Sequence, residues 1–286
     1  MPPSWKSKDA KGDALPPQHF ILGPPVKRGE KIIIYGPGGI GKTLLACLIE
    51  RTTGPVGFID LDDSLGVLEG PLVECGLSPL SITGIKDWGA LTGALESNAF
   101  DGVSNVVVYT ATAAQDMAII EAVRRNPKTE GGMDASSIES YGYGKGYRYL
   151  QDTWLDLKYA LTEHSARGRN TILIAHDFVL KVPNPDGPDY IRYEPALHQD
   201  SAISIRRLMR DWADHMFYIG YDVSVDAADP RRGKKHGKAS GSGTRTIYPV
   251  ETATCMAKSR RLSESIPYEY GDDALWRALF NKPATE

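Results

Sequence analysis

The sequence predicts an α/β fold: one mainly parallel β-sheet covered by helices, with an antiparallel C-terminal hairpin at the sheet edge. Apolar, β-branched runs typical of buried strands alternate with amphipathic stretches of helical period. The last two runs have no helix between them, which favours a hairpin. The predicted strands lie at residues 31–36, 56–61, 105–110, 170–176, 215–223 and 245–252, and the helices at 43–51, 113–125, 147–167 and 203–213.

Length and composition are those of an ordinary globular protein. The chain has 286 residues, 41% hydrophobic and 24% charged, and a formal net charge of −3. This overall charge gives no sign of nucleic-acid binding, so any basic surface must be local. Neither a run of about 18 apolar residues nor an N-terminal signal sequence is visible. We therefore expect a cytoplasmic protein without membrane contact.

The domain organisation is predicted to be simple. Residues 1–18 are rich in Pro, Lys and Asp, which predicts a flexible N-terminal arm, and residues 19–286 are predicted to form a single domain. Residues 226–245 form a low-complexity basic stretch between the last two predicted strands, and we expect a mobile hairpin loop there. Its Lys234 and Lys235 are candidate phosphate contacts, with a solvated loop tip as the alternative.

The strongest motif in the chain is a phosphate-binding loop. The letters GPGGIGKT satisfy G-x-x-x-x-G-K-[ST], between a β-branched strand and an apolar-periodic helix, as this motif requires. Its glycines let backbone N–H groups turn inward around phosphates, Lys42 adds a positive charge, and the Thr43 hydroxyl is suited to Mg²⁺. The predicted ligands are ATP and Mg²⁺, and the predicted contacts are Gly36, Pro37, Gly38, Gly39, Ile40, Gly41, Lys42 and Thr43.

Acidic residues follow the second predicted strand, in the stretch GFIDLDDSLG. Asp60 ends the strand and is a candidate Mg²⁺ ligand. Asp62 is placed to act as a general base that polarises water for attack on the γ-phosphate. The alternative is that Asp62 and Asp63 only cap a turn before the next helix. The third predicted strand ends in Tyr109, where nucleotide-hydrolysing α/β proteins usually place an aspartate that helps to hold Mg²⁺.

Four segments, in this order, resemble the RecA-like P-loop ATPases, and within them the compact phage nucleotide-binding proteins of the Sak-type single-strand annealing group. They are GPGGIGKT, GFIDLDDSL, TILIAH followed by a loop, and MAKSRRL, and the resemblance covers residues 19–265. It implies a RecA-like core and a homo-oligomer, either a ring or a filament. It also implies a location in the host cytoplasm if the protein is phage-encoded.

The resemblance assigns catalytic roles to four residues. Asp62 falls where the family places its catalytic glutamate, although aspartate is one methylene shorter. His176 ends its strand as the family's polar γ-phosphate sensor does, with a satisfied core histidine as the alternative. Lys258 and Arg260 resemble the K-x-R element that such proteins insert into the neighbouring subunit's site. A solvated basic turn is the alternative for this pair.

Under the same resemblance, Tyr109 occupies the position of the Walker B aspartate. A phenol is neutral at pH 7 and supplies no negative charge to the ion. Three interpretations are open: Asp60 or Asp62 takes over the metal, the protein binds nucleotide but turns it over poorly, or the residue is an engineered or accidental change. Of these, we expect weak turnover.

One stretch has the composition of a single-strand nucleic-acid contact. In SYGYGKGYRYLQD, aromatic residues alternate with cations, which is the chemistry of sequence-tolerant single-strand binding. The candidates are Tyr141, Tyr143, Lys145, Tyr147 and Arg148. The alternative is that Tyr147 and Tyr149 begin a helix and pack into the core. Residues 177–195 follow His176, where the resemblance implies a DNA-facing loop, and the arginines of residues 204–212 are predicted to lie on an exposed helix face.

Two functions remain open at this point. The first is an ATP-dependent recombination protein that binds single-stranded DNA and promotes annealing or strand pairing as a homo-oligomer. A single-strand binding protein is a further candidate partner. The second is a nucleotide-dependent switch that recruits a protein partner, with little or no hydrolysis and no DNA. A metabolite kinase is disfavoured because neither an arginine-rich lid nor an acceptor pocket is recognisable in the sequence.

Overall fold

A computed structural model describes residues 23–280 except 185, 201 and 227–237. The predicted N-terminal arm lies outside the described residues. So do Lys234 and Lys235 in the predicted basic loop. The predicted bounds of that loop, 226–245, are wrong at both ends, because residue 226 ends β7 and residues 238–245 belong to β8, which pairs with β7. None of the helices in the described part of the chain is long and apolar enough to cross a membrane.

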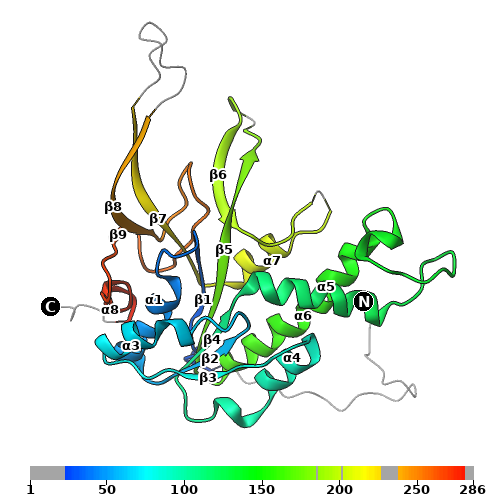
Figure 1. Cartoon of the computed structure of the whole chain (residues 1–286), viewed down its shortest axis with the longest axis horizontal. Helices are drawn as coiled ribbons and strands as arrows, with labels where there is room; N and C mark the ends of the chain where they lie inside the picture. Colours follow the sequence, from blue (N-terminus) through cyan, green and yellow to red (C-terminus); the bar gives the residue numbers. More distant parts are fainter. Residues whose placement is uncertain (1–22, 185, 201, 227–237, 281–286) are drawn as a thin grey trace, which may run out of the picture.

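Nine strands in the described residues form one sheet, in the order β3-β2-β4-β5-β1-β7-β8-β9, with β6 paired to β5 off this path (Figure 1). The strands are β1 (Lys31–Gly36), β2 (Val56–Asp60), β3 (Leu80–Ile82), β4 (Asn105–Tyr109), β5 (Asn170–Val182), β6 (Tyr190–Pro195), β7 (His215–Asp226), β8 (Lys238–Tyr248) and β9 (Ile266–Pro267). Pairing is parallel from β3 through to β7 and antiparallel for β7–β8, β8–β9 and β5–β6. The predicted fold class, including the antiparallel hairpin at the sheet edge, is confirmed.

Helices cover both faces of the sheet. They are α1 (Lys42–Leu48), α2 (Glu50–Thr53), α3 (Glu69–Glu74), α4 (Trp88–Glu96), α5 (Ala111–Arg125), α6 (Lys145–Ala166), α7 (Ile205–Trp212) and α8 (Ala274–Phe280). Short 3₁₀ turns lie at η1 (Gly66–Leu68), η2 (Asn98–Phe100) and η3 (Ile138–Tyr141). Helix α5 shows how the sequence sets such an element. At the start of α5, the Thr110 hydroxyl accepts a hydrogen bond from the Ala113 N–H. In its last turn, the positive charges of Arg124 and Arg125 interact favourably with the negative end of the helix dipole.

The core consists of two apolar layers, one on each face of the sheet. Strand β1 contributes side chains to both layers, because alternate side chains of a strand point to opposite faces of the sheet. Ile33 and Tyr35 pack with Trp154 and the other buried residues of α4, α5, α6 and α7. Ile32 and Ile34 pack with α1 and α8. This double burial explains why β1 is a continuous apolar run rather than an alternating one.

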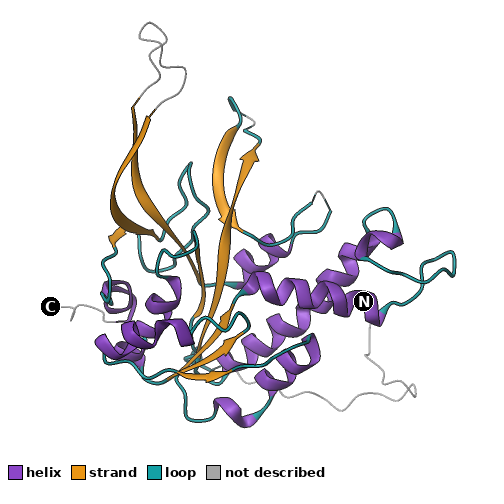
Figure 2. Cartoon of the chain, in the orientation of Figure 1, coloured by secondary structure: helices purple, strands orange, loops and turns teal. Residues whose placement is uncertain are grey.

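Two hairpin arms extend beyond the helices at the carboxyl ends of the parallel strands. Figure 2 shows the β5–β6 and β7–β8 pairs as long strands on the same side of the molecule. Strand β5 runs on to Val182, so the predicted loop directly after His176 is wrong: a β-hairpin follows instead. The β5–β6 arm carries exposed apolar side chains, Phe178 (54%) and Ile191 (67%) among them.

Candidate nucleotide-binding site

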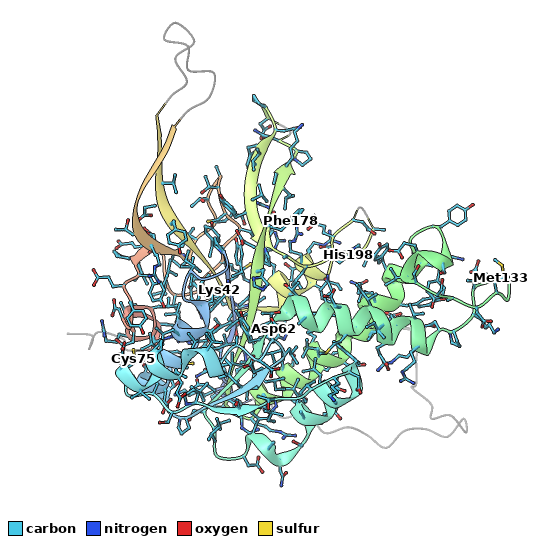
Figure 3. The ribbon with its side chains drawn as sticks, in the orientation of Figure 1. Lys42, Asp62, Cys75, Met133, Phe178 and His198 are labelled. Carbon is cyan, nitrogen blue, oxygen red and sulfur yellow. The ribbon has the colours of Figure 1, made fainter. Side chains whose placement is uncertain are left out.

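The sheet brings the predicted catalytic elements to one edge, where the carboxyl ends of β1, β2, β4 and β5 meet. In the strand register, Gly36 pairs with His176, and Asp60 pairs with Tyr109. The phosphate-binding loop follows β1 directly, so it lies at the same edge. Figure 3 shows Lys42 and Asp62 in this region, and Phe178 on the arm above it. This edge is where open parallel sheets place their ligands.

The glycines of the loop are required by its backbone. Gly36 has a φ of 155°, and a Cβ on it would lie 2.3 Å from the Ile219 carbonyl oxygen on β7. Gly41, with a φ of 104°, precedes the first residue of α1. Neither conformation suits an ordinary L-residue. The predicted loop therefore has the strand, the turn and the following helix that its motif requires.

Lys42 points back into its own loop. Its ammonium donates hydrogen bonds to the carbonyl oxygens of Gly36 at 2.7 Å and Pro37 at 2.8 Å. The side chain is buried, and burial lowers the pKa of Lys42 to about 8, while the nearby charge of Asp177 opposes that shift. The cation is thus held inside the concave side of the loop, where it can exchange carbonyl partners for phosphate oxygens.

Tyr109 lies beside the predicted Mg²⁺ ligand Thr43. Its hydroxyl lies near the side chains of Thr43 and Ser64. Burial raises the pKa of Tyr109, and the nearby charge of Asp62 raises it further, so the phenol stays neutral at pH 7. The peptide bond joining Tyr109 to Thr110 is cis. Tyr109 is therefore uncharged at the end of its strand, near the hydroxyl that the motif assigns to Mg²⁺.

The two candidate carboxylates have different surroundings. Asp60 is buried, and its oxygens accept hydrogen bonds from the N–H groups of Ser64 at 3.1 Å and Leu65 at 2.8 Å. Its charge is thus used to close the turn after β2. Asp62 is exposed and accepts a hydrogen bond from the Thr110 hydroxyl at 3.2 Å. Of the two, Asp62 has the more accessible carboxylate beside Tyr109, and its roles in hydrolysis stay predictions.

His176 and its neighbour Asp177 complete this edge. Burial lowers the pKa of His176, and the positive charge of Lys42 lowers it further. The imidazole is therefore neutral at pH 7, and its role as a γ-phosphate sensor stays a prediction. The charge of Asp177 acts on both Lys42 and His176, which places it among the candidate site residues. Asp177 is missing from the predicted set, although it directly follows His176 in the AHD triplet.

The oxygen-rich donor set fits Mg²⁺. Thr43, Tyr109 and Ser64 offer hydroxyl oxygens close together, with Asp62 as the nearby exposed carboxylate. Mg²⁺ prefers oxygen ligands and is usually held by one or two carboxylates together with substrate phosphates and water. These residues suit an ion that the nucleotide brings with it, rather than one held by a dedicated cage of protein side chains.

Lys258 and Arg260 do not reach this chain's own phosphate-binding loop. Lys258 pairs through its backbone with Met216 in the middle of the sheet, and its ammonium donates to the Arg210 and Ala213 carbonyl oxygens at 3.0 and 2.7 Å. The Arg260 guanidinium lies 3.6 Å from Asp214, at the amino end of β1, and is 64% exposed. Their insertion into a neighbouring subunit's site stays a prediction.

The amino ends of the strands border a cavity of about 970 Å³, which we call the basic cavity. Its charged lining residues are Lys27, Arg28, Arg167, Arg169, Arg260, Arg261, Glu30 and Asp214. Arg28 and Arg260 are paired with Asp214, and Arg261 is paired with Glu30. The lining has six cations and two carboxylates, so the cavity keeps a positive excess that favours anions.

Three of the five predicted nucleic-acid side chains that the structure describes are engaged within the chain. Tyr141 is buried and donates to the Asn126 carbonyl oxygen, Lys145 pairs with Glu130, and Tyr147 stacks on the His198 ring with centroids 4.1 Å apart. The alternative interpretation is that Tyr147 and Tyr149 begin a helix and pack into the core: both lie in the first turns of α6, Tyr147 packs against the core, and the Tyr149 ring packs edge-on against Tyr141. Tyr143 is fully exposed and Arg148 is exposed, so these two are available to a partner.

The prediction of an exposed basic face on α7 is wrong in one respect. Arg206 is buried and pairs with Glu194 at 2.7 Å. Glu194 lies on β6, so its position depends on the β5–β6 hairpin, which the sequence pattern did not predict.

Comparison with known proteins agrees with the P-loop assignment. No curated protein matches the sequence. A solved structure of a KaiC-like protein from the hyperthermophilic archaeon Pyrococcus horikoshii is 12% identical, covers 85% of this chain and 86% of its own, and has a TM-score of 0.43. The family described as AAA domain matches residues 28–261, a span that includes the phosphate-binding loop, Tyr109, His176 and Arg260. This chain is therefore a P-loop ATPase that belongs to the AAA domain family.

Proposed function

We propose that this chain binds ATP with Mg²⁺, hydrolyses it slowly, and acts on single-stranded DNA in recombination or annealing, as the resemblance to the Sak-type group implies. The observation that carries the slow turnover is the position of the neutral Tyr109 phenol at the end of β4, near Thr43. A carboxylate at this position would bring a negative charge to the ion, whereas a neutral phenol brings none.

Each residue of the site has a part in this proposal. The loop N–H groups and Lys42 bind the phosphates, and Thr43 binds the ion. Bound Mg²⁺ supplies positive charge that neutralises the phosphate oxygens. Asp62 orients the attacking water, and neutral His176 donates or accepts a hydrogen bond that distinguishes bound triphosphate from diphosphate. Because the Tyr109 phenol is neutral, the site keeps its affinity for nucleotide but loses part of the stabilisation of the transition state for hydrolysis.

The arms support a role for the nucleotide state beyond the site. Strand β5 passes His176 beside the loop and continues without a break into the β5–β6 arm. A change at His176 is therefore transmitted along one rigid strand to Phe178 and Val179, which are exposed.

Aromatic faces and cations bind single strands by stacking and charge, and exposed Tyr143 and Arg148 offer both.

A homo-oligomer completes the proposal. Arg260 is exposed at the basic cavity, where it can meet the phosphates of a nucleotide bound by a neighbouring copy. An arginine in that role neutralises charge on the transferring γ-phosphoryl group. In this arrangement the active sites are completed between subunits.

The test is ATP binding and hydrolysis with and without an unstructured oligonucleotide at two salt concentrations. We expect tight nucleotide binding, slow turnover that DNA stimulates, salt-sensitive DNA binding, and loss of nucleotide binding in Lys42→Ala. Nucleotide binding with no DNA affinity at low salt would instead support the second candidate, a switch that recruits a protein partner. The exposed apolar side chains of the β5–β6 arm favour that candidate.

A further inference from the structure

The C-terminal part of the chain reaches back to the phosphate-binding loop through two hydrogen-bond donors. The Arg245 guanidinium, on β8, donates to the Ile40 carbonyl oxygen at 2.9 Å. The Tyr268 hydroxyl, just after β9, donates to the Gly41 carbonyl oxygen at 2.9 Å. The two side chains also contact each other, with the guanidinium carbon 5.6 Å from the centre of the Tyr268 ring.

These contacts set the direction of two loop N–H groups. In a trans peptide unit, the C=O and the N–H of the next residue point in opposite directions. A donor that holds the Ile40 carbonyl on the C-terminal side therefore turns the Gly41 N–H away from that side. The Gly41 carbonyl accepts two hydrogen bonds, one from Tyr268 and one from the Leu45 N–H of α1 at 2.9 Å, so Tyr268 and the helix together direct the Lys42 N–H. N–H groups of such a loop cradle the α- and β-phosphates of a nucleotide.

The two donors are themselves fixed in place. Tyr268 is buried, and its backbone N–H donates to the Arg245 carbonyl oxygen at 2.8 Å. A Cβ on Gly41 would lie 3.0 Å from the Tyr268 hydroxyl oxygen and 3.1 Å from the Arg245 guanidinium. The pair thus forms a close wall behind the loop. Donors that are in place before a ligand arrives cost no reorganisation when it binds.

We propose that Arg245 and Tyr268 are positioning residues of the nucleotide site: they preset the Gly41 and Lys42 N–H groups for the phosphates. The inference rests on nucleotide binding at this loop, as proposed above. It predicts that either side chain affects every ligand that carries the diphosphate unit to the same degree. The γ-phosphate and the base lie beyond the two N–H groups in question.

The chain offers a matched control in Trp276. Its indole N–H donates to the Leu45 carbonyl oxygen at 2.6 Å, so it belongs to the same C-terminal segment and also bonds to a backbone carbonyl. Leu45 lies inside α1, beyond the loop. Trp276→Phe should therefore lower the thermal midpoint without changing nucleotide affinity.

The experiment measures the affinity of ATP, ADP and inorganic pyrophosphate by calorimetry, with the thermal midpoint of each ligand-free variant. For Tyr268→Phe, which keeps the ring, we expect all three affinities to fall by about fivefold, the value of one hydrogen bond. Arg245→Met should lose about tenfold, and Arg245→Lys should recover part of that loss, because an ammonium can still donate to Ile40.

Several results would overturn the inference. They are an unchanged affinity in Tyr268→Phe, a loss for ATP alone, or an equal loss in Trp276→Phe. If Arg245→Met does not fold, Tyr268→Phe still decides the matter. A wild-type chain that binds none of the three ligands would contradict the proposed function, and this inference with it. A wild-type chain that binds all three while Tyr268→Phe matches it would contradict the inference only.

Discussion

The hydroxyl of Tyr109 lies near the side chain of Thr43, the residue that the phosphate-loop motif assigns to Mg²⁺. The register of the sheet explains this proximity, because Tyr109 ends β4 beside Asp60 on β2 and Ile174 on β5. Strand β4 therefore ends where the sequence predicts a Mg²⁺ ligand, and it places a neutral phenol there instead of a carboxylate. The consequences for turnover can be tested by changing that chemistry alone.

Replacing the phenol by a carboxylate should increase hydrolysis. We expect Tyr109→Asp to raise the rate of phosphate release by about tenfold or more, because a negative charge then helps to hold the ion. The same variant should reach half-maximal activity at a lower Mg²⁺ concentration. The measurement is steady-state phosphate release across a Mg²⁺ titration.

Tyr109→Phe is the control for this substitution, because it removes the hydroxyl and adds no charge. It should leave turnover as slow as in the wild type. A wild-type rate that already equals that of Tyr109→Asp would show that Asp62 or Asp60 serves the ion and that the phenol is no handicap.

Nucleotide affinity should depend on pH through Lys42. Its pKa is about 8 in the folded protein, against an ordinary value of 10.5, so the ammonium loses its proton above pH 8. The charged form binds phosphates, and affinity should therefore be constant below about pH 7.5. It should then fall by close to tenfold per pH unit above 8, towards the level of Lys42→Ala.

The check is a set of ADP titrations between pH 7 and pH 10. Lys42→Ala provides the baseline, and its weak affinity should not follow the same curve. A wild-type affinity that stays constant up to pH 10 would mean that Lys42 keeps its proton in the ligand-free protein.

The sequence predicted the parts of this protein that depend on local patterns. The phosphate loop directly follows β1 in the sequence, and its spacing of glycines followed by Lys42 and Thr43 is found in few other kinds of structure. The structure places His176 and Asp62 at the same edge of the sheet as the loop, because parallel strands bring their carboxyl ends together, and the catalytic roles of both residues stay predictions. The extension of β5 was missed, since exposed apolar residues after His176 are equally compatible with a loop.

Side chains whose partners are distant in the chain could not be placed from the sequence. Tyr141 sits in a glycine-rich stretch that is typical of an exposed loop, yet its hydroxyl is held by the Asn126 carbonyl. Lys258 has the spacing of a catalytic element, yet it caps carbonyls of α7 that lie more than forty residues away. A sequence pattern shows which chemical groups a side chain offers. Only the fold shows which partners within the chain those groups already bind.

The roles of Lys258 and Arg260 can be distinguished by how much each substitution changes the free energy of unfolding. Lys258→Met should lower the free energy of unfolding by about 1–3 kcal/mol, because it removes a charged donor from two helix-end carbonyls. Arg260→Ala should change it by less than about 0.5 kcal/mol, because the side chain is mostly exposed. Denaturant unfolding measures both. If Arg260→Ala keeps full stability yet lowers ATP hydrolysis, that supports a role across a subunit boundary, whereas unchanged hydrolysis speaks against it.

Single-strand binding should depend on the exposed residues of the tyrosine stretch and not on the buried ones. Tyr143→Ala and Arg148→Ala should each weaken binding of an oligonucleotide by about five- to tenfold, through lost stacking and lost charge. Tyr141→Phe is the matched control, because its ring is buried and only the bond to Asn126 is removed. Fluorescence anisotropy at low salt is the measurement, and equal affinities for all four proteins would exclude this surface as the DNA contact.

Acid stability should depend on Asp214 at the amino end of β1. Burial of Asp214 would raise its pKa, but the hydrogen bonds from Arg28 and the Lys31 N–H outweigh this and lower it to about 2. A carboxylate with a folded pKa below its unfolded value of 3.8 stabilises the fold above pH 4. That contribution, about 2 kcal/mol, is lost as the pH falls from 4 to 2.

Asp214→Asn tests this assignment, because it keeps the shape of the side chain and removes the titration. At pH 7 the variant should be less stable than the wild type by at least the same 2 kcal/mol, since Arg28 loses its charged partner. The difference between the two proteins should narrow between pH 4 and pH 2, as the wild-type carboxylate takes up its proton. Denaturant titrations at several pH values measure this difference, and one that stays constant over that range would place the acid-sensitive group elsewhere.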